Sequence, residues 1–240
     1  MRQFKLFFIR KIKGLFLVLN LHFLFGWLNP FLSNLYYLNK FSNWRSKHNK
    51  PGFNDFYSFN FKRDGRYQIY NYLLEKENAS EDINYLEFGV AYGNTMRWWV
   101  NNNKNKDTRF YGFDTFEGLP EDWHLYKKGE MSPENIPLID DSRVTFFKGL
   151  FQDTLRNFLN DFKDDKRKVI NMDADLYTST LYVLTTIAPL LKSNDIIIFD
   201  EFGVPLHEFK AFIEFVNSFY INYEVIAAVN NYFQLAIKIL

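Results

Sequence analysis

The sequence contains no cysteine among its 240 residues. This absence excludes disulfide bonds, thiolate zinc sites and cysteine nucleophiles, and it is typical of a protein in the reducing cytoplasm. Residues 1–50 also lack acidic residues and a long apolar run. Residues 1–50 contain no Asp or Glu, and their apolar run, residues 14–28, spans about 15 residues. A membrane-spanning helix needs roughly 20, so this run does not predict one.

Residues 1–50 differ in charge from the rest of the chain. They carry nine Lys or Arg residues, which leaves 20 basic against 28 acidic residues, a net charge of −8, for residues 51–240. We therefore divide the chain into a basic, apolar N-terminal arm (1–50) and a main domain (51–240). No small-residue cleavage site follows the apolar run, which argues against a signal peptide.

Two interpretations of the arm remain open. In the first, it is an amphipathic segment in the interface of an anionic membrane, which would hold the protein at the inner face of that membrane. In the second, it is a helix that packs on the domain, or on a second subunit to form a homodimer. Nucleic acid is not expected as a partner, because the basic residues flank an apolar block instead of alternating with stacking positions.

Residues 51–240 alternate between strand and helix patterns. Apolar and aromatic content of 47% and 20% is that of a globular domain with a large core. Strands are expected at 83–88, 108–113, 143–147, 169–172, 195–199, 223–229 and 232–239, and helices at 67–76, 94–102, 153–162, 178–191 and 206–220. Only Asn230 and Asn231 separate the last two strands, which predicts an antiparallel hairpin.

This pattern predicts the fold class. We expect an α/β, Rossmann-like, doubly wound domain with a mostly parallel seven-stranded sheet, a C-terminal antiparallel hairpin and an N-terminal helical arm. Ligands of such sheets bind at the carboxyl ends of the strands. Four of these ends carry acids, namely Glu87, Asp114, Asp173 and Asp200. One such acid is often only a helix cap, but four along one edge predict a negatively charged ligand site.

The spacing of the glycines narrows the choice of ligand. A dinucleotide fingerprint needs Gly-x-Gly-x-x-Gly, whereas this chain has Gly89-x-x-x-Gly93 directly after Glu87, whose charge would repel a phosphate. No Lys follows the glycines, which excludes a P-loop. S-adenosylmethionine fits better, because it has no phosphate and carries a sulfonium, an ammonium and a ribose diol. An NAD-dependent oxidoreductase and a catalytically silent nucleoside-binding module remain the alternatives.

Four sequence stretches make the chain similar to class I S-adenosylmethionine-dependent methyltransferases, and most similar to the macrocin O-methyltransferase (TylF-like) family. The stretches are residues 87–93, 111–120, 148–155, and 173–180 together with 199–201. The resemblance implies O-methylation of a hydroxyl on a sugar, glycoside or related small molecule. It also implies a Mg²⁺ ion held by Asp173, Asp200 and Glu201, although Asp-Asp is the more usual pair where this chain has Asp200-Glu201.

The resemblance also implies the cofactor contacts. The methionine end would lie against Glu87, Gly89 and Gly93, the ribose against Asp114, and the adenine near Phe116 or the turn at 148–151. The full set of predicted cofactor-binding residues is Glu87, Gly89, Ala91, Gly93, Asp114, Thr115, Phe116, Lys148, Gly149 and Asp173.

Methyl transfer to a hydroxyl requires a proton acceptor. Asp173 and Asp175 are candidates for this base, and His207, shortly after the fifth strand of the domain, is a third. The segment at 117–142 is rich in Pro, Gly and charge, and we expect it to cover the acceptor.

Overall fold

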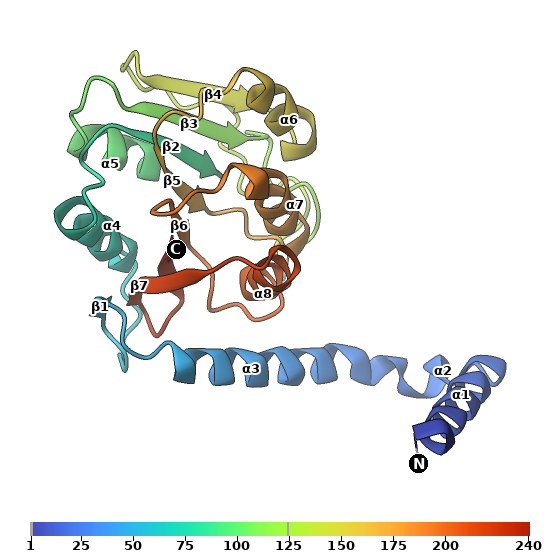
Figure 1. The fold of residues 1–240 in the computed structure, drawn as a ribbon. Coiled ribbons are helices and arrows are strands. Elements are labelled where there is room, and N and C mark those ends of the chain that lie inside the picture. The colour runs from blue at the N-terminus through green and yellow to red at the C-terminus, as the bar shows by residue number, and fades with distance from the viewer. Residues whose placement is uncertain (1, 124) are drawn as a thin grey trace.

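The domain is built on one eight-stranded sheet (Figure 1). The computed structural model describes residues 2–123 and 125–240. The strand order is β1-β7-β8-β6-β5-β2-β3-β4. The strands are β1 (Phe53–Asn54), β2 (Ile83–Phe88), β3 (Arg109–Asp114), β4 (Val144–Lys148), β5 (Arg167–Met172), β6 (Ile196–Phe199), β7 (Tyr223–Val229) and β8 (Gln234–Ile239).

The predicted fold class is confirmed. Strands β6, β5, β2, β3 and β4 are parallel to one another, and β8 is antiparallel to both β6 and β7. The sheet has one strand more than the seven expected. This extra strand, β1, pairs in parallel with β7 over Phe53 and Asn54. Two residues are too few to produce a periodicity that the sequence could reveal.

The hairpin turn is longer than predicted. β8 begins at Gln234, so the turn comprises residues 230–233 instead of Asn230 and Asn231 alone. Tyr232 belongs to the turn because its backbone has a positive φ of 66° and its buried hydroxyl donates to the carbonyl of His48 at 2.8 Å. Contacts with a distant part of the chain therefore end the strand, and not the local residue pattern.

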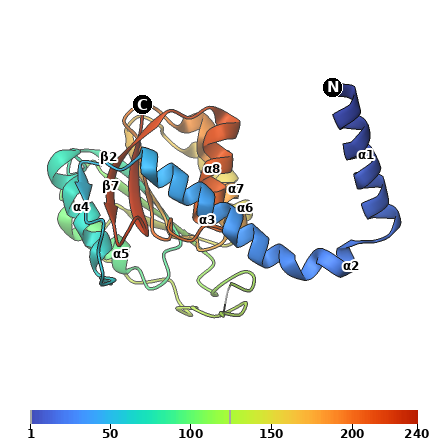
Figure 2. The ribbon, with the colours of Figure 1, turned by 90° about the horizontal axis from the view of Figure 1, so that it is seen from below.

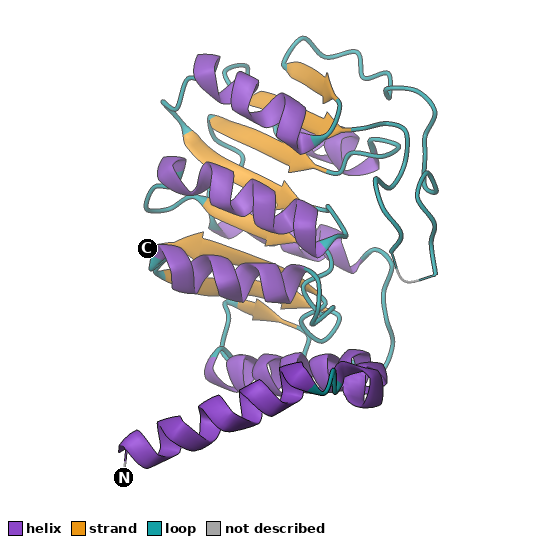
Figure 3. Ribbon diagram, turned by 90° about the vertical axis from the view of Figure 1, so that its right-hand side faces the viewer, coloured by secondary structure: helices purple, strands orange, loops and turns teal. Residues whose placement is uncertain are grey.

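Helices cover both faces of the sheet, so the domain has three layers. Helices α6, α7 and α8 lie over one face (Figure 3), and α4 and α5 cover the other. Their bounds are α4 (Gly65–Lys76), α5 (Asn94–Asn102), α6 (Phe151–Asp161), α7 (Tyr177–Ile187) and α8 (Glu208–Phe219). A short 3₁₀ helix at Ala188–Leu190 extends α7.

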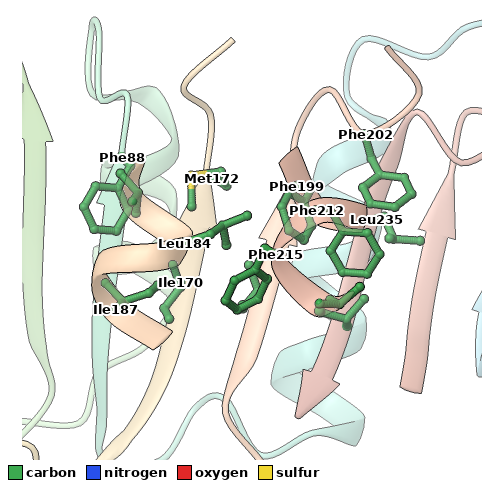
Figure 4. Packing of buried hydrophobic residues seen from close by; sticks show 14 of the residues in the cluster. Phe88, Ile170, Met172, Leu184, Ile187, Phe199, Phe202, Phe212, Phe215 and Leu235 are labelled. Atoms are coloured by element: carbon green, nitrogen blue, oxygen red, sulfur yellow. The ribbon is translucent and has the colours of Figure 1, made fainter. Parts of the chain in front are cut away.

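Aromatic side chains fill the layer between the sheet and α7 and α8 (Figure 4). Phe199 of β6 contacts Phe212 of α8 and Phe202, with ring centroids 5.5 and 5.4 Å apart. Each such buried ring removes a large apolar area from water. Most of the aromatic residues of the domain thus build its core.

The arm is helical and only partly packed on the domain. It consists of α1 (Arg2–Val18), α2 (His22–Phe25), a 3₁₀ turn (Gly26–Leu28) and α3 (Asn29–Lys47). Trp44 of α3 is buried against Phe202 and donates its indole N–H to Tyr223 at 2.8 Å. The first part of α3 extends beyond the domain, and α1 lies at its far end (Figures 1 and 2).

Among residues 2–123 and 125–240, no single helix is long and apolar enough to cross a membrane. The helical stretches 2–18 and 22–47, which are bent by 84° at their junction, meet the length and hydropathy criteria only as a pair.

The four acids at strand ends lie along one edge of the sheet. Their strands are neighbours in the order β6-β5-β2-β3, with β2 and β5 paired at the point where the order of the strands along the sheet reverses. This is the switch point at which doubly wound sheets bind ligands. The predicted position of the site at the strand ends therefore coincides with the observed switch point.

Candidate functional site

A cavity of about 590 Å³ opens at the carboxyl ends of β2, β3, β5 and β6. Its size is within the range of small-molecule sites. It is lined by residues of the glycine turn (residues 89–93), of the two loops after β3 and β4, and of the ends of β5 and β6. Among the predicted site residues, the cavity is lined by Glu87, Gly89, Ala91, Asp114, Thr115, Asp173, Asp175, Asp200 and Glu201.

Asp114 at the end of β3 holds the glycine turn in shape. Its Oδ2 accepts hydrogen bonds from the N–H groups of Val90 and Ala91, both at 2.8 Å. Its Oδ1 accepts a third, at 2.7 Å, from the N–H of Phe116. Hydrogen bonds to a carboxylate are stronger than those between neutral groups. Asp114 therefore fixes both the glycine turn after β2 and the start of the segment after β3.

The glycine turn approaches the end of β5 closely. Gly89 has a φ of 92°, and a Cβ atom on it would lie 1.8 Å from the backbone oxygen of Asp173. Gly93, with a φ of 73°, precedes α5 and packs against Pro137. It does not line the cavity, although the sequence assigned it a cofactor contact. Gly89 therefore brings two strand ends together, and Gly93 shapes the start of the helix.

Replacing Gly89 with Ala should disrupt the site. We expect Gly89→Ala to lower the melting temperature markedly and to abolish cofactor binding, because the Cβ would collide with backbone that cannot move freely. Gly129→Ala is the matched control, since Gly129 has a similar φ of 86° but no heavy atom within 4 Å of the position that a Cβ would take. It should cost only about 1–2 kcal/mol of backbone strain. Thermal unfolding of both variants checks this prediction. An equal loss of melting temperature in the two variants would contradict it.

Besides Gly93, three more of the predicted cofactor residues lie away from the cavity. Phe116 is fully buried against Phe146, with ring centroids 5.9 Å apart. Lys148 forms an ion pair with Glu117 at 2.9 Å, and Gly149 donates its N–H to the carbonyl of Asp114. The turn after β4 instead reaches the cavity through Leu150, Phe151 and Gln152, the residues that follow.

Besides Asp114 and Glu121, five carboxyl groups line the cavity: Glu87, Asp173, Asp175, Asp200 and Glu201. Glu87 is 1% exposed and accepts a hydrogen bond from the Tyr85 hydroxyl at 3.0 Å. Burial, together with the charge of Asp173, raises the pKa of Glu87 well above its usual range. Such a cluster is unfavourable as five separate anions, and a bound cation would stabilise it.

Asp175 and Glu201 have strongly shifted pKa values. Burial, then the charges of Asp173 and Glu201, raise the pKa of Asp175 to about 8. Burial, then the charges of Asp173 and Asp200, raise the pKa of Glu201 to about 8 as well. Asp175 also has a positive φ of 57°, a conformation that is uncommon for residues other than glycine and that concentrates at functional sites.

The raised pKa of Glu201 predicts a pH-dependent stability. The folded protein keeps the proton of Glu201 up to about pH 8, whereas the unfolded chain releases it near pH 4. The contribution of Glu201 to the stability of the folded protein therefore falls as the pH rises from about 4 to about 8. We expect Glu201→Gln to raise the melting temperature more at pH 8.5 than at pH 5. Thermal unfolding at both pH values, with exposed Glu75→Gln as control, tests this; an equal shift at both would contradict it.

The three predicted metal ligands do not form a metal site. Among the described residues, no group of three His, Cys, Asp or Glu side chains is arranged to hold a metal ion. Instead, the guanidinium of Arg66 lies between two of them, with Nη1 3.2 Å from Asp173 Oδ2 and Nη2 2.7 Å from Asp200 Oδ2. The predicted Mg²⁺ ion is thus not supported, because an arginine already occupies the position between two of its three predicted ligands.

His207 lies outside the cavity lining. It precedes α8 at the N-cap position, and its ring lies nearly perpendicular to that of Trp123 at a centroid distance of 6.3 Å. Of the three candidate bases, Asp173 and Asp175 therefore line the cavity, and Asp173 is already engaged by Arg66.

The segment after β3 contributes one wall of the cavity. Leu119 and Trp123 are buried with Leu176, which precedes α7, and Thr178 donates to Glu121 at 2.9 Å. The sequence marked this segment as a cover without identifying its contact residues. It also gave no indication of Arg66, which belongs to α4 and lies 107 residues before Asp173.

A family model for a methyltransferase domain matches residues 86–202, which run from β2 to just past β6. No curated protein matches the chain. The structure of the calicheamicin methyltransferase CalS11 aligns with a TM-score of 0.55 and 19% identity, covering 72% of this chain and 80% of that chain. The O-methyltransferase NovP aligns with a TM-score of 0.50 and 24% identity, covering 65% and 71%.

A second CalS11 structure, described as a TDP-rhamnose 3'-O-methyltransferase, aligns at 19% identity with a TM-score of 0.49, covering 72% of this chain and 80% of that chain. At these identities the structural likeness establishes a shared fold. That fold is the Rossmann-like fold of these methyltransferases.

Proposed function

We propose that this chain is a class I S-adenosylmethionine-dependent methyltransferase, and specifically an O-methyltransferase that acts on a hydroxyl group of a sugar, a glycoside or a related small molecule. One observation carries the proposal: a cavity at the switch point combines a glycine turn with a cluster of five carboxyl groups. Arg66 is the one Lys, Arg or His among the described residues that line this cavity. A phosphate-bearing cofactor would be repelled there, whereas a sulfonium and an ammonium would be attracted.

The residues present fit S-adenosylmethionine. Glu87 and Asp173 line the cavity and offer carboxylates to the ammonium group, and Gly89 lines it beside them. Asp114 keeps about one of its four lone-pair sites for a ribose hydroxyl, beyond the three N–H groups from which it already accepts hydrogen bonds. When bound, the cofactor supplies an electrophilic methyl group.

We assign Asp175 as the proton acceptor. It lines the cavity, whereas Asp173 is held by Arg66 and His207 lies outside the lining. With the cofactor bound, the hydroxyl oxygen of the acceptor would take its methyl group, which would give a methyl ether and S-adenosylhomocysteine. The Asp175 carboxylate would accept the proton of that hydroxyl. Most of the acceleration should come from positioning and water exclusion by the cavity walls.

The acceptor class rests on two considerations. The sequence stretches at 111–120 and 173–180 are similar to those of the macrocin O-methyltransferase family. CalS11, with which the chain shares its fold, is described as a TDP-rhamnose 3'-O-methyltransferase. Nucleotide-linked deoxysugars and glycosides are therefore the first acceptors to test.

The test is methyl transfer from labelled S-adenosylmethionine to a panel of nucleotide sugars, glycosides, catechols and amines. We expect a methyl ether on a sugar hydroxyl, formed in equal amount with S-adenosylhomocysteine. Transfer to an amine or a catechol alone would contradict the acceptor class. Binding of the cofactor without transfer to any acceptor would favour the silent nucleoside-binding module.

A further inference from the structure

The outer arm, defined as residues 2–36, exposes an unusual amount of apolar surface. No residue of α1 is buried, and Phe4, Val18, Phe23 and Trp27 are 68%, 78%, 80% and 75% exposed. Monomeric soluble proteins rarely display a continuous apolar surface of this kind, and one that does usually binds a partner or a membrane.

The charge of the outer arm is entirely of one sign. Arg2, Lys5, Arg10, Lys11 and Lys13 all lie on α1, and residues 1–50 contain no acidic side chain. The apolar residues 14–19 follow directly, and the chain then bends through α2 towards α3. Basic residues that border an apolar bend match a bilayer surface, where anionic headgroups lie above the hydrocarbon.

The base of the arm is fixed to the domain. Phe41 and Trp44 pack on Phe209 and Phe202, and the Tyr37 hydroxyl donates to Glu214 of α8 at 3.1 Å. Residues 37–48 therefore pack on the domain, whereas the outer arm projects away from it (Figures 1 and 2). A rigid attachment of this kind would hold the domain at a fixed distance from whatever the outer arm binds.

We propose that the outer arm docks on an anionic membrane surface, inserting the apolar bend at residues 14–32 into one leaflet while the basic residues of α1 contact the headgroups. Positive charge without any acidic residue favours this occupant over a second copy of the chain, whose outer arm carries the same charge and would repel it. The cytoplasmic leaflet carries the negative surface potential that the proposal requires, which would place the protein at the inner face of the membrane.

Vesicle co-sedimentation of the full chain tests this proposal. We expect binding to vesicles of phosphatidylcholine with phosphatidylglycerol, at least tenfold weaker binding to phosphatidylcholine alone, and weakening by salt. Replacing Lys5, Arg10, Lys11 and Lys13 with Gln should lower the affinity for anionic vesicles at least tenfold. Replacing Leu17, Phe23 and Trp27 with Ser should abolish stable binding. Thermal unfolding and S-adenosylhomocysteine binding verify that both variants are folded.

Three outcomes would overturn the proposal. They are equal binding to neutral and anionic vesicles, no binding to either by the folded wild type, or a stable dimer by light scattering that the Leu17, Phe23 and Trp27 replacements dissociate. None of these readouts depends on methyl transfer, so the membrane proposal and the proposed function can fail separately.

A second inference comes from Arg66. Its guanidinium bridges the carboxylates of Asp173 and Asp200, which follow the paired strands β5 and β6. The sequence analysis had assigned these two carboxylates to a metal ion. Planar guanidinium donors match such a pair of carboxylates and remain charged throughout the physiological range. We infer that Arg66 is the resident cation of the acidic cluster and positions Asp173 and Asp200, so that no divalent ion is needed there. This inference rests on the proposed function for its catalytic meaning.

Divalent-ion binding, measured without cofactor, tests the Arg66 inference. We expect Mn²⁺ or Mg²⁺ to produce no saturable shift in the melting temperature of the wild type, and EDTA to leave its activity unchanged. Arg66→Ala should gain a saturable stabilisation by Mn²⁺, because the carboxylates lose their cation, whereas Arg66→Lys should not. Saturable Mn²⁺ binding by the wild type would overturn the inference, even if Arg66→Ala fails to fold. So would a folded Arg66→Ala that gains no Mn²⁺ affinity. S-adenosylhomocysteine binding in the same samples reports separately on the proposed function.

Discussion

Replacing Asp114 with Asn should weaken S-adenosylhomocysteine binding by about a hundredfold. The two carboxylate oxygens accept three backbone N–H groups, those of Val90, Ala91 and Phe116. An amide has only one acceptor oxygen, so at least one N–H loses its partner and faces an NH₂ group instead. Each hydrogen bond to a charged group contributes about 1.5–3 kcal/mol, and the loss also releases the turn that shapes the cavity.

Calorimetric titration with S-adenosylhomocysteine measures this effect. Asp165→Asn is the control, because Asp165 lies outside the residues that line the cavity. It should bind like the wild type. An Asp114→Asn protein that is folded and binds with wild-type affinity would show that the turn keeps its shape without the carboxylate, against the role that we assign to it.

Replacing Asp175 with Asn should lower kcat by at least about a hundredfold, the usual range for loss of a general base. Affinity for S-adenosylhomocysteine should change only a few-fold, because Asn has nearly the same size and the reacting carboxylate is lost without altering the turn. The wild-type rate should rise with pH, since only the ionised carboxylate accepts a proton. The pKa of about 8 places the midpoint of this rise near pH 8 in the free protein, and a bound cationic cofactor would lower it.

Steady-state kinetics against pH check this assignment. The rise with pH should disappear in Asp175→Asn. His207→Gln serves as the comparison, because His207 was the other candidate base and lies outside the cavity lining; it should retain most of its activity and the pH-dependent rise. If His207→Gln loses the rise and Asp175→Asn keeps it, the base is His207.

Local patterns predicted most of the fold of the domain. The bounds of β2 and α5 agree with the sequence prediction at both ends, because an apolar strand, a glycine turn and an amphipathic helix are each defined by neighbouring residues. The four acids also lie on adjacent strands, as the doubly wound order requires. Topology rules thus brought together residues that are up to 113 positions apart in the chain.

What the sequence could not supply depends on long-range contacts. Arg66 reaches Asp173 and Asp200 only because α4 packs beside the switch point, and no local pattern relates an arginine near a helix start to two distant strand ends. Likewise, Lys148 turns towards Glu117 and Phe116 turns inwards, so these residues leave the cavity lining even though they follow the correct strands. Periodicity places a residue on an element, but the direction of its side chain depends on tertiary packing.

Calorimetric titration of the wild-type protein with S-adenosylhomocysteine and, separately, with NAD⁺ tests the central claim most directly. We predict a single S-adenosylhomocysteine site with a micromolar dissociation constant and no detectable NAD⁺ binding, because Glu87 and a turn without a middle glycine keep a pyrophosphate out of the cofactor position beside that turn. Binding of NAD⁺ without binding of S-adenosylhomocysteine would contradict the account and favour an oxidoreductase.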